Sequence, residues 1–256
     1  MGVLERILSK KRDEIEELAS RPLPSPPPRR AVDLRRADGA LKLITEIKRR
    51  SPSAGALSTR LGVAERARVY ERGGASMLSV LCDASFFDGA FEHLLEAKRA
   101  TELPVLCKEF ILDEIQLDHA RAHGADAVLL IVRCLTLERL PQLISAARQR
   151  ELVPFVEIAS EAEARLALDA GADLIGVNAR DLDTLTMDAN RARQILAALP
   201  DDVVRVHLSG VADELQIQAL CTSRADAALV GEALMRLDDP KPLLERLIRA
   251  ARPGSI

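Results

Sequence analysis

Leu41-Lys-Leu-Ile-Thr-Glu-Ile-Lys-Arg-Arg-Ser-Pro-Ser-Ala-Gly55 begins as an apolar run and ends on two opposite charges, Glu46 and Lys48, before a loop of small residues. Side chains alternate between the two faces of a strand, so Glu46 and Lys48 share one face with Ile44. Charged side chains are rarely buried unless they are paired. Two interpretations therefore fit this stretch: an edge strand with a solvated salt bridge, or a barrel strand whose carboxyl end carries chemistry.

The size and composition of the chain favour the barrel. Its 256 residues are close to the roughly 250 that are typical of a (β/α)8 barrel. Apolar residues make up 48% of the chain, whereas aromatic residues are limited to five Phe and one Tyr. Aliphatic side chains must then fill the interior, as Val, Ile and Leu do in such barrels. We expect a single barrel domain spanning residues 1–256.

Charge and cysteine usage exclude several classes of protein. The net charge is −3 with both signs interspersed, which favours neither nucleic acid nor an anionic membrane surface as a partner. There is no C-x-x-C pair, so the spacing predicts neither a zinc site nor a disulfide framework. The charged N-terminus and the absence of a long apolar run argue against secretion and membrane insertion. We expect a cytoplasmic protein with reduced thiols at Cys82, Cys107, Cys134 and Cys221.

From residue 41 onward, strand-like apolar runs alternate with helix-like segments eight times. The predicted strands span residues 41–48, 76–81, 104–108, 127–132, 152–157, 173–178, 203–208 and 227–231. The predicted helices span residues 60–73, 90–101, 113–123, 136–150, 160–170, 188–199, 211–222 and 240–252. Eight strand–helix units joined by right-handed crossovers predict an α/β protein, a (β/α)8 TIM barrel.

A short repeat supports this count. Gly74-Ala-Ser, Gly124-Ala-Asp, Gly171-Ala-Asp and Arg224-Ala-Asp each precede a predicted strand, at intervals of about 50 residues. Each interval contains two β/α units, and glycine suits the left-handed position that closes a helix. A two-unit period fits a closed barrel better than an open doubly wound sheet. No G-x-G-x-x-G fingerprint follows the first strand, which argues against a dinucleotide fold.

Residues 1–40 precede the repeat. Apolar residues at helical spacing predict an amphipathic helix over residues 3–19, and residues 21–28 are too rich in proline for a helix or a central strand. The mixed charge of the helix argues against a membrane anchor. We expect an extra N-terminal helix and a proline-rich connector, both packed on the barrel.

Polar side chains stand at the ends of several predicted strands, where the reacting groups of barrel enzymes lie. The strands concerned end on Glu46 and Lys48, on Lys108, on Glu157 and on Asn178. One such ending could be a solvated terminus, but two lysines and two glutamates from three strands are harder to explain in that way. Burial should lower the pKa of these lysines and raise that of the glutamates, so that they exchange protons near neutral pH.

The two last strands offer an anion site. Ser209-Gly210 and Gly231-Glu232 follow them, where barrels of this kind bind phosphate through backbone N–H groups. The carboxylate of Glu232 must then point away. Four apolar residues near other strand ends could form a flat slot for an aromatic ring, although each alone is more often plain packing. They are Pro52, Phe87, Phe110 and Leu129.

Six segments in order carry a resemblance to a known family, and it covers nearly the whole chain. They are Glu46-Ile-Lys-Arg-Arg-Ser-Pro-Ser, Leu78-Ser-Val-Leu through Phe87-Asp-Gly, Cys107-Lys-Glu-Phe-Ile, Gly124-Ala-Asp-Ala-Val-Leu-Leu-Ile, Gly176-Val-Asn-Ala-Arg-Asp-Leu and Val230-Gly-Glu-Ala-Leu-Met-Arg. Together they resemble indole-3-glycerol phosphate synthase of tryptophan biosynthesis. The resemblance implies a carboxy-lyase that cyclises 1-(2-carboxyphenylamino)-1-deoxyribulose 5-phosphate with loss of CO2 and water, without metal or redox cofactor.

The resemblance also implies residue roles. Lys108 resembles the general acid, Glu157 the general base or cation-stabilising carboxylate, and Lys48, supported by Glu46, a phosphate contact and second acid. The implied substrate-binding positions are Ser51, Pro52, Phe87, Phe110, Leu129, Asn178, Arg180, Leu182 and Ser209. The implied phosphate positions are Lys48, Ser209, Gly210, Gly231 and Glu232. The implied partner is the small-molecule substrate alone, with a monomer expected and association with other enzymes of the pathway open.

Two departures from the family pattern stand out. Leu208-Ser209-Gly210 replaces the usual Glu-Ser-Gly, and Cys82-Asp83 stands where Thr-Asp or Thr-Glu is common. Leucine accepts no hydrogen bond, and an unpaired substrate donor would cost about 1–3 kcal/mol. Two alternatives to the synthase therefore stay open: a Schiff-base aldolase that uses Lys108 or Lys48 as nucleophile on a sugar phosphate, and a catalytically weakened homologue that retains phosphate binding.

Overall fold

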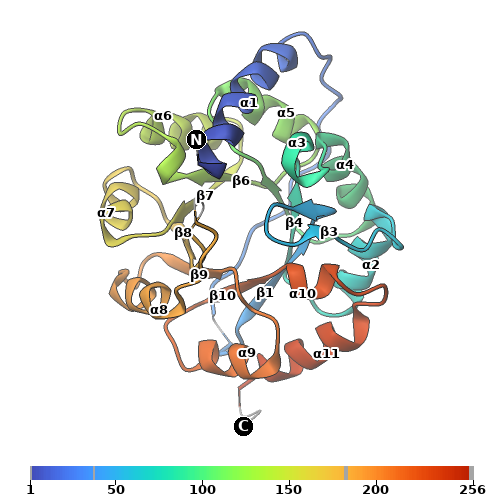
Figure 1. Cartoon of the computed structure of the whole chain (residues 1–256), viewed down its shortest axis with the longest axis vertical. Coiled ribbons are helices and arrows are strands. Elements are labelled where there is room, and N and C mark those ends of the chain that lie inside the picture. Colours follow the sequence, from blue (N-terminus) through green and yellow to red (C-terminus); the bar gives the residue numbers. More distant parts are fainter. Residues whose placement is uncertain (1, 37, 182–183, 254–256) are drawn as a thin grey trace.

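The structure is a computed structural model that describes residues 2–36, 38–181 and 184–253. Parallel strands close a barrel in the order β1-β10-β9-β8-β7-β6-β5-β4 (Figure 1). Their bounds are β1 (Lys42–Ile47), β4 (Met77–Leu81), β5 (Val105–Lys108), β6 (Ala127–Ile131), β7 (Val153–Ile158), β8 (Leu174–Asn178), β9 (Val204–Leu208) and β10 (Ala227–Val230). The predicted TIM barrel is confirmed, and each predicted strand is present to within a residue or two.

The strand β1 pairs with β10 on one side and with β4 on the other. The interpretation of residues 41–48 as an edge strand is therefore wrong, because closure of the barrel leaves β1 no free edge. The loop after β1 adds an antiparallel pair that the sequence did not predict, β2 (Arg50–Ser51) with β3 (Gly55–Ala56).

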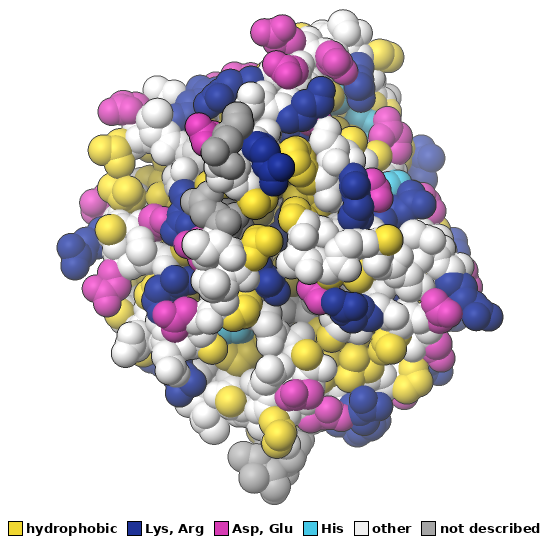
Figure 2. All heavy atoms as spheres, in the orientation of Figure 1, with side chains coloured by type: hydrophobic (Ala, Val, Ile, Leu, Met, Phe, Trp, Pro, Cys, Tyr) yellow, Lys and Arg dark blue, Asp and Glu magenta, His cyan; other side chains and the backbone are white. Residues whose placement is uncertain are grey.

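Helices follow the barrel strands and surround them (Figure 1). The long ones are α2 (Val63–Arg72), α4 (Phe91–Ala100), α5 (Glu114–Ala122), α6 (Arg139–Gln149), α7 (Glu161–Asp169), α8 (Ala189–Ala198), α9 (Glu214–Cys221) and α11 (Lys241–Ala250). Three short helices at strand ends were not delimited from the sequence: α3 (Ala84–Phe87), η1 (Val132–Cys134) and α10 (Glu232–Met235). Basic and acidic side chains are interspersed over the face in Figure 2.

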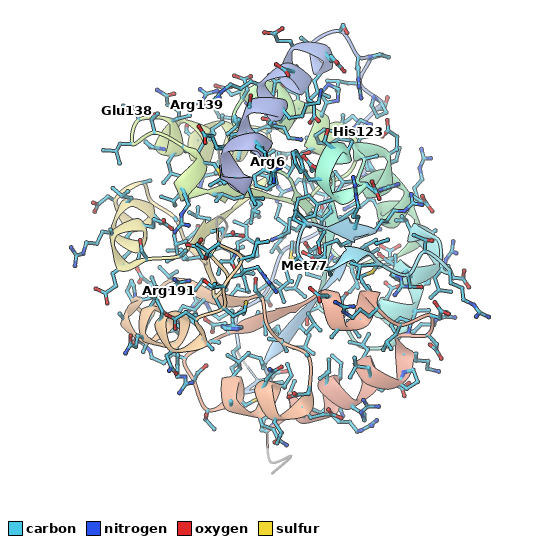
Figure 3. All side chains as sticks on the ribbon, viewed as in Figure 1. Arg6, Met77, His123, Glu138, Arg139 and Arg191 are labelled. Carbon is cyan, nitrogen blue, oxygen red and sulfur yellow. The ribbon has the colours of Figure 1, made fainter. Side chains whose placement is uncertain are left out.

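The core has two layers because parallel strands are covered on both faces. Alternate side chains of each strand fill the barrel interior, where Ile44, Met77 and Phe155 are fully buried. Figure 3 shows Met77 inside the ring of strands. The intervening side chains, Leu43 and Leu78 among them, pack against the helices. This alternation aims Glu46 and Lys108 into the barrel.

The repeated turns before strands behave as predicted at three of the four positions. Gly74, Gly124 and Gly171 have φ of +94°, +94° and +79°, the left-handed region that favours glycine. The fourth turn has Arg224 in place of glycine, and its backbone is held instead by the Ser223 hydroxyl, which accepts the Ala225 N–H at 3.1 Å.

The first forty residues contact the barrel at both of its ends. The helix α1 (Val3–Leu18) places Leu4 and Ile7 against the interior cluster and contacts α5. The connector is held by the aspartates of two repeated turns: Asp126 accepts the Arg30 backbone N–H at 2.7 Å, and Asp226 accepts that of Arg36 at 3.3 Å. One domain spanning residues 1–256, with residues 1–40 packed on the barrel, stays a prediction.

Candidate active site

A cavity of about 880 Å³ opens at the carboxyl ends of the barrel strands. Its volume suits a drug-sized molecule, since ligand pockets of about 300–1,000 Å³ are usual. All the predicted site residues within the described chain line this cavity: Glu46, Lys48, Ser51, Pro52, Phe87, Lys108, Phe110, Leu129, Glu157, Asn178, Arg180, Ser209, Gly210, Gly231 and Glu232. Leu182 lies outside the described residues.

The first ion pair of the cavity comes from β1 and the residue after it. Lys48 Nζ lies 2.8 Å from Glu46 Oε1, and the Glu46 side chain is 3% exposed. The carboxylate rests against Gly231, where an added Cβ would lie 2.6 Å from Glu46 Oε1. Glycine is therefore required at position 231 for Glu46 to occupy this place.

The second ion pair joins β5 to β7 across β6. Lys108 Nζ lies 3.5 Å from Glu157 Oε2, and both side chains point into the cavity. The Glu157 side chain is 3% exposed, whereas that of Lys108 is 19% exposed. We call the four side chains of the two pairs the cavity quartet: Glu46, Lys48, Lys108 and Glu157.

The expected pKa shifts of the quartet are wrong in direction for the two groups whose shift is resolved. Burial by itself would lower the pKa of Lys108, but the carboxylates of Glu157 and Glu46 raise it above its usual value. Burial by itself would raise the pKa of Glu46, but the ammonium groups of Lys48 and Lys108 lower it. Opposite charges within ion-pair distance favour the charged forms more than burial opposes them.

A hydrogen-bonded chain runs from the second ion pair to the end of β9. The amide of Asn178 donates to Glu157 Oε1 at 2.8 Å, while its oxygen accepts the Ser209 hydroxyl at 2.7 Å. The same oxygen accepts the Arg180 backbone N–H at 2.9 Å. Glu157 Oε2 accepts no hydrogen bond from the described residues. Within the described chain, Oε2 is thus held only by the 3.5 Å ion pair with Lys108, whereas the hydrogen bond from Asn178 to Oε1 fixes the orientation of the carboxylate.

The turn after β9 adopts an unusual backbone conformation. Ser209 and Gly210 have φ of +73° and +81°, so a non-glycine residue sits in the left-handed region. Such a residue costs about 1–3 kcal/mol unless its surroundings compensate. The hydrogen bond of the Ser209 hydroxyl to Asn178 gives that compensation and places the turn at the cavity wall.

The apolar wall of the cavity combines the barrel with α1. The rings of Phe87 and Phe110 lie 6.2 Å apart between centroids, tilted by 37°. Val3, Leu4 and Ile7 of α1 also line the cavity, and the sequence did not predict this. Their helical spacing indicated an apolar face, but no local pattern indicated what that face covers.

Leu208, which replaces the usual carboxylate of the family pattern, is 1% exposed and belongs to the interior cluster. It packs beside Gly176 and Phe155: a Cβ added to Gly176 would lie 2.6 Å from Leu208 Cδ1 and from Phe155 Cε2. Leu208 also reaches the cavity surface. The side of the cavity next to Asn178 is therefore apolar at this point.

A second buried charge cluster fixes α1 beside the cavity. Lys11 Nζ lies 2.9 Å from Asp83 Oδ2 and 3.0 Å from Glu109 Oε1, and it also pairs with Glu14 at 2.5 Å. We call these four side chains the Lys11 cluster: Lys11, Glu14, Asp83 and Glu109. Sequence reasoning missed the cluster, because Asp83 and Glu109 follow different strands and Lys11 belongs to the N-terminal helix.

The Lys11 cluster supports the aromatic wall and contains one perturbed acid. Asp83 Oδ1 accepts the Phe86 N–H at 2.6 Å at the start of α3, and Glu109 Oε1 accepts the Phe110 N–H at 2.7 Å. Burial raises the pKa of Glu109 to about 7, although Lys11 opposes the shift. Three carboxylates around one ammonium leave an excess negative charge, so one acid keeps its proton more easily.

Metal and membrane signatures are absent from the part of the chain that the structure describes. No group of three or more His, Cys, Asp or Glu side chains there is arranged to hold a metal ion. Among the same residues, no helix has the length and apolar character needed to cross a membrane.

Comparison with known proteins gives consistent matches. The family model of indole-3-glycerol phosphate synthase matches residues 4–247. The indole-3-glycerol phosphate synthase of Mycolicibacterium vanbaalenii is 42% identical over 238 residues, which cover 93% of this chain and 86% of that protein. That of Leptospira interrogans is 40% identical over 239 residues, 93% of each. A solved 3-hexulose-6-phosphate synthase aligns with a TM-score of 0.66 at 19% identity, over 83% of this chain and 100% of that chain, which shows the fold alone.

A closed parallel barrel with ion-paired lysines and glutamates at the carboxyl ends of its strands defines an enzyme of the (β/α)8-barrel class. The match to the family model over nearly the whole chain goes further than the class. The chain belongs to the indole-3-glycerol phosphate synthase family. The predicted family is thereby confirmed.

Proposed function

We propose that the protein is an indole-3-glycerol phosphate synthase, a carboxy-lyase (a decarboxylase) of tryptophan and hence aromatic amino-acid biosynthesis. Its substrate is 1-(2-carboxyphenylamino)-1-deoxyribulose 5-phosphate, which it converts to indole-3-glycerol phosphate, CO2 and water. Family membership supports the activity. The single observation that carries the mechanism is the Lys108–Glu157 ion pair in a cavity large enough for this substrate.

Ring closure requires a proton donor. As the anthranilate ring carbon attacks the ribulose carbonyl carbon, the C=O bond becomes a C–OH bond and its oxygen takes a proton from Lys108. A raised pKa keeps Lys108 protonated at neutral pH, which suits a general acid. The C–C bond to the carboxylate then breaks, CO2 leaves, and its electron pair restores the ring.

Dehydration requires an acid and a base together. The hydroxyl group leaves as water with a proton from Lys48, and Glu157 takes the proton that the forming indole releases. Glu157 Oε2 is the oxygen that accepts it, because Asn178 donates to Oε1 whereas Oε2 has, among the described residues, only the 3.5 Å ion pair with Lys108. Glu46 supports Lys48 at 2.8 Å and keeps the ammonium aimed into the cavity.

The cavity has one part that binds the phosphate anion and another, apolar part that binds the aromatic ring. Lys48 and the backbone N–H groups of the turns after β9 and β10 hold the phosphate, at Ser209, Gly210, Gly231 and Glu232. The Glu232 carboxylate is turned to Arg236 at 2.7 Å, which keeps its charge occupied. The aromatic ring lies among Pro52, Phe87, Phe110 and Leu129, while Ser51, Asn178 and Arg180 hold the carboxylate and the sugar.

The geometry argues against the Schiff-base aldolase. A lysine nucleophile must lose its proton, and enzymes achieve this by lowering its pKa. Lys108 has a raised pKa, and Lys48 forms a close ion pair with Glu46. Both arrangements suit proton donors. Leu208 keeps the weakened homologue open as an outcome of the test below, because an unpaired substrate donor beside it would lower turnover.

The proposed reaction uses neither a metal nor a redox cofactor, since it moves only protons and splits off CO2 and water. We also propose that the protein acts in the cytoplasm, in keeping with its free cysteines, and that it acts as a monomer. Association with other enzymes of tryptophan biosynthesis stays a prediction.

Turnover of the substrate, followed by the fluorescence of the indole product, tests the activity. We expect product formation that saturates with substrate and is inhibited by inorganic phosphate. No product at high enzyme concentration, together with stabilisation by phosphate against heat, would show the weakened homologue instead. A mass adduct after borohydride reduction with a ketose phosphate would show the aldolase.

A further inference from the structure

Arg66 of α2 is a fully buried arginine on the outer face of the barrel, away from the cavity. Arg66 is 1% exposed to solvent. Its guanidinium donates to the backbone carbonyls of Leu234 and Leu237, each at 3.2 Å. Both acceptors lie at or just after the end of α10, the short helix that follows the turn at Gly231. The contact therefore links α2 to the segment proposed to hold phosphate.

Tyr70 extends this link to β1. Arg66 donates to the Tyr70 hydroxyl at 3.5 Å, and that hydroxyl lies 3.4 Å from the backbone oxygen of Glu46 and 3.5 Å from Met235 Sδ. Burial raises the pKa of Tyr70 to about 12, so the hydroxyl keeps its proton and can donate to Glu46. We call residues 231–237 the α10 segment. A continuous series of contacts thus joins the α10 segment to Arg66, Tyr70 and the end of β1.

These contacts lie directly behind the site. The Glu46 side chain points into the cavity, while its carbonyl oxygen meets Tyr70 on the outer face of the barrel. Inside, Glu46 Oε1 touches Gly231 so closely that an added Cβ would lie 2.6 Å away. The distance between β1 and the α10 segment therefore cannot shrink without a steric clash between Glu46 and Gly231. Arg66 and Tyr70 bridge the same two elements from outside the barrel.

The charge of Arg66 indicates that the bridge has a purpose beyond packing. Its guanidinium forms no ion pair within 4.0 Å among the described residues, although it acts from farther away on Asp238, and its Nε donates no hydrogen bond there. Burying a cation without an ionic partner is costly, and a long apolar side chain would fill the same space without that cost. What the guanidinium adds is a pair of fixed donors to two carbonyls of one short segment.

We propose that Arg66 and Tyr70 are positioning residues for phosphate binding, which set the gap between β1 and the α10 segment and hence the places of Glu46, Lys48 and Gly231. The inference rests on the proposed function, because it takes the turn at Gly231 as part of the phosphate site. Neither residue touches the substrate. Their loss should weaken phosphate binding, which uses Lys48 and the turn at Gly231 directly, more than it slows ring closure, whose proton comes from Lys108 at another strand.

The test compares four single variants with the wild type. Arg66→Met keeps most of the length of the side chain but removes its donors, and Arg66→Lys keeps the charge but replaces the planar fork of donors by a single ammonium group. Tyr70→Phe removes the hydroxyl alone. Arg68→Met is the matched control, since Arg68 is an exposed residue of the same helix. KM and kcat are measured with the substrate, and the inhibition constant is measured with inorganic phosphate, all well below the melting temperature of each variant.

We expect Arg66→Met to raise KM and the phosphate inhibition constant about tenfold, with kcat changed less than about threefold. Arg66→Lys and Tyr70→Phe should show smaller shifts in the same direction, and Arg68→Met none. If melting temperatures fall while KM and phosphate inhibition stay at wild-type values, the residues are only structural and the inference is overturned. Should Arg66→Met not fold, Tyr70→Phe decides by the same criterion.

The wild type separates this inference from the proposed function. A wild type that turns over substrate and is inhibited by phosphate supports the proposed function whatever the variants do. A wild type that turns over substrate without phosphate inhibition, or that is neither active nor stabilised by phosphate against heat, overturns the phosphate site, and the inference about Arg66 with it. For a wild type that is inactive but stabilised by phosphate, the same variants are compared by that stabilisation, and an unchanged value in Arg66→Met overturns the inference.

Discussion

Two clusters of buried charge lie at neighbouring strand ends of this barrel, and they differ in their balance of charges. The cavity quartet has two lysines and two glutamates. The Lys11 cluster has one lysine and three carboxylates within 2.5–3.0 Å of its ammonium group. Both combine fully buried with partly exposed side chains, yet one lines the cavity and the other ties α1 to the loops after β4 and β5.

The balance of charges decides how each cluster holds its protons. In the quartet, the pKa of Lys108 is raised and that of Glu46 is lowered, so both stay charged at neutral pH. In the Lys11 cluster, burial raises the pKa of Glu109 to about 7, since one lysine does not offset three acids. Burial alone therefore does not predict the state of a group, and the number of nearby opposite charges does.

The largest expected effect concerns Lys108, the proposed general acid of the quartet. Lys108→Ala should lower kcat by about 10²–10⁴-fold, because a general acid acts in the transition state. Ser51→Ala, which removes a proposed binding group, should cost far less. Steady-state kinetics with the indole fluorescence assay measure both variants. Equal losses of kcat would show that Lys108 is not the general acid.

Removal of the single cation of the Lys11 cluster should affect stability most. Lys11→Met leaves three carboxylates, two of them buried, around an apolar side chain, at a cost of about 3–5 kcal/mol in the free energy of unfolding. KM should rise as well, because α1 and both phenylalanines line the cavity. Urea unfolding measures the stability, with Lys10→Met at the exposed neighbouring position as control. Similar midpoints for the two variants would show that the cluster is not needed for docking of α1.

The raised pKa of Glu109 gives the stability a pH dependence of definite sign. The folded state holds this proton more tightly than the unfolded chain, whose glutamates titrate near 4.5. The resulting stabilisation is complete below about pH 4.5 and is lost as the pH rises through about 7, by about 3 kcal/mol in all.

Glu109→Gln should remove this component of the pH dependence. Glu46, whose pKa is lowered, contributes in the opposite sense, with stability lost as the pH falls. Unfolding free energies of the wild type and the variant between pH 4.5 and 8 measure the difference. A difference that does not change with pH would mean that Glu109 titrates normally.

The smallest expected effect is that of a variant at Leu208, which gives the quartet an excess of carboxylates like that of the Lys11 cluster. Leu208→Glu places a third carboxylate beside the two of the quartet, next to Phe155, and should lower the free energy of unfolding by about 1–3 kcal/mol at neutral pH. It should also raise kcat/KM several-fold, since it offers an acceptor to the substrate donor that Leu208 leaves unpaired. Leu208→Met is the apolar control. Unchanged kcat/KM in Leu208→Glu would show that no substrate donor faces this position.

Local patterns in the sequence predicted the elements and the rim of the site. The alternation along residues 41–48 placed Glu46 and Lys48 on the inner face, and the polar ends of β5, β7 and β8 indicated the same rim. These features depend on the period of a strand and on the order of strands in a barrel, both of which can be recognised from neighbouring residues.

The same patterns could not predict which charges pair or how they titrate. Lys11 meets Glu109, and Arg66 meets Leu237, only after the barrel has closed and brought distant segments within a few ångströms. The pKa of Lys108 was expected to fall on burial, but it is raised because Glu157 and Glu46 lie near it. The sequence determined the fold and the kinds of side chain at the rim. The tertiary structure alone decided their partners and charge states, since electrostatic energy depends on distances in space and not along the chain.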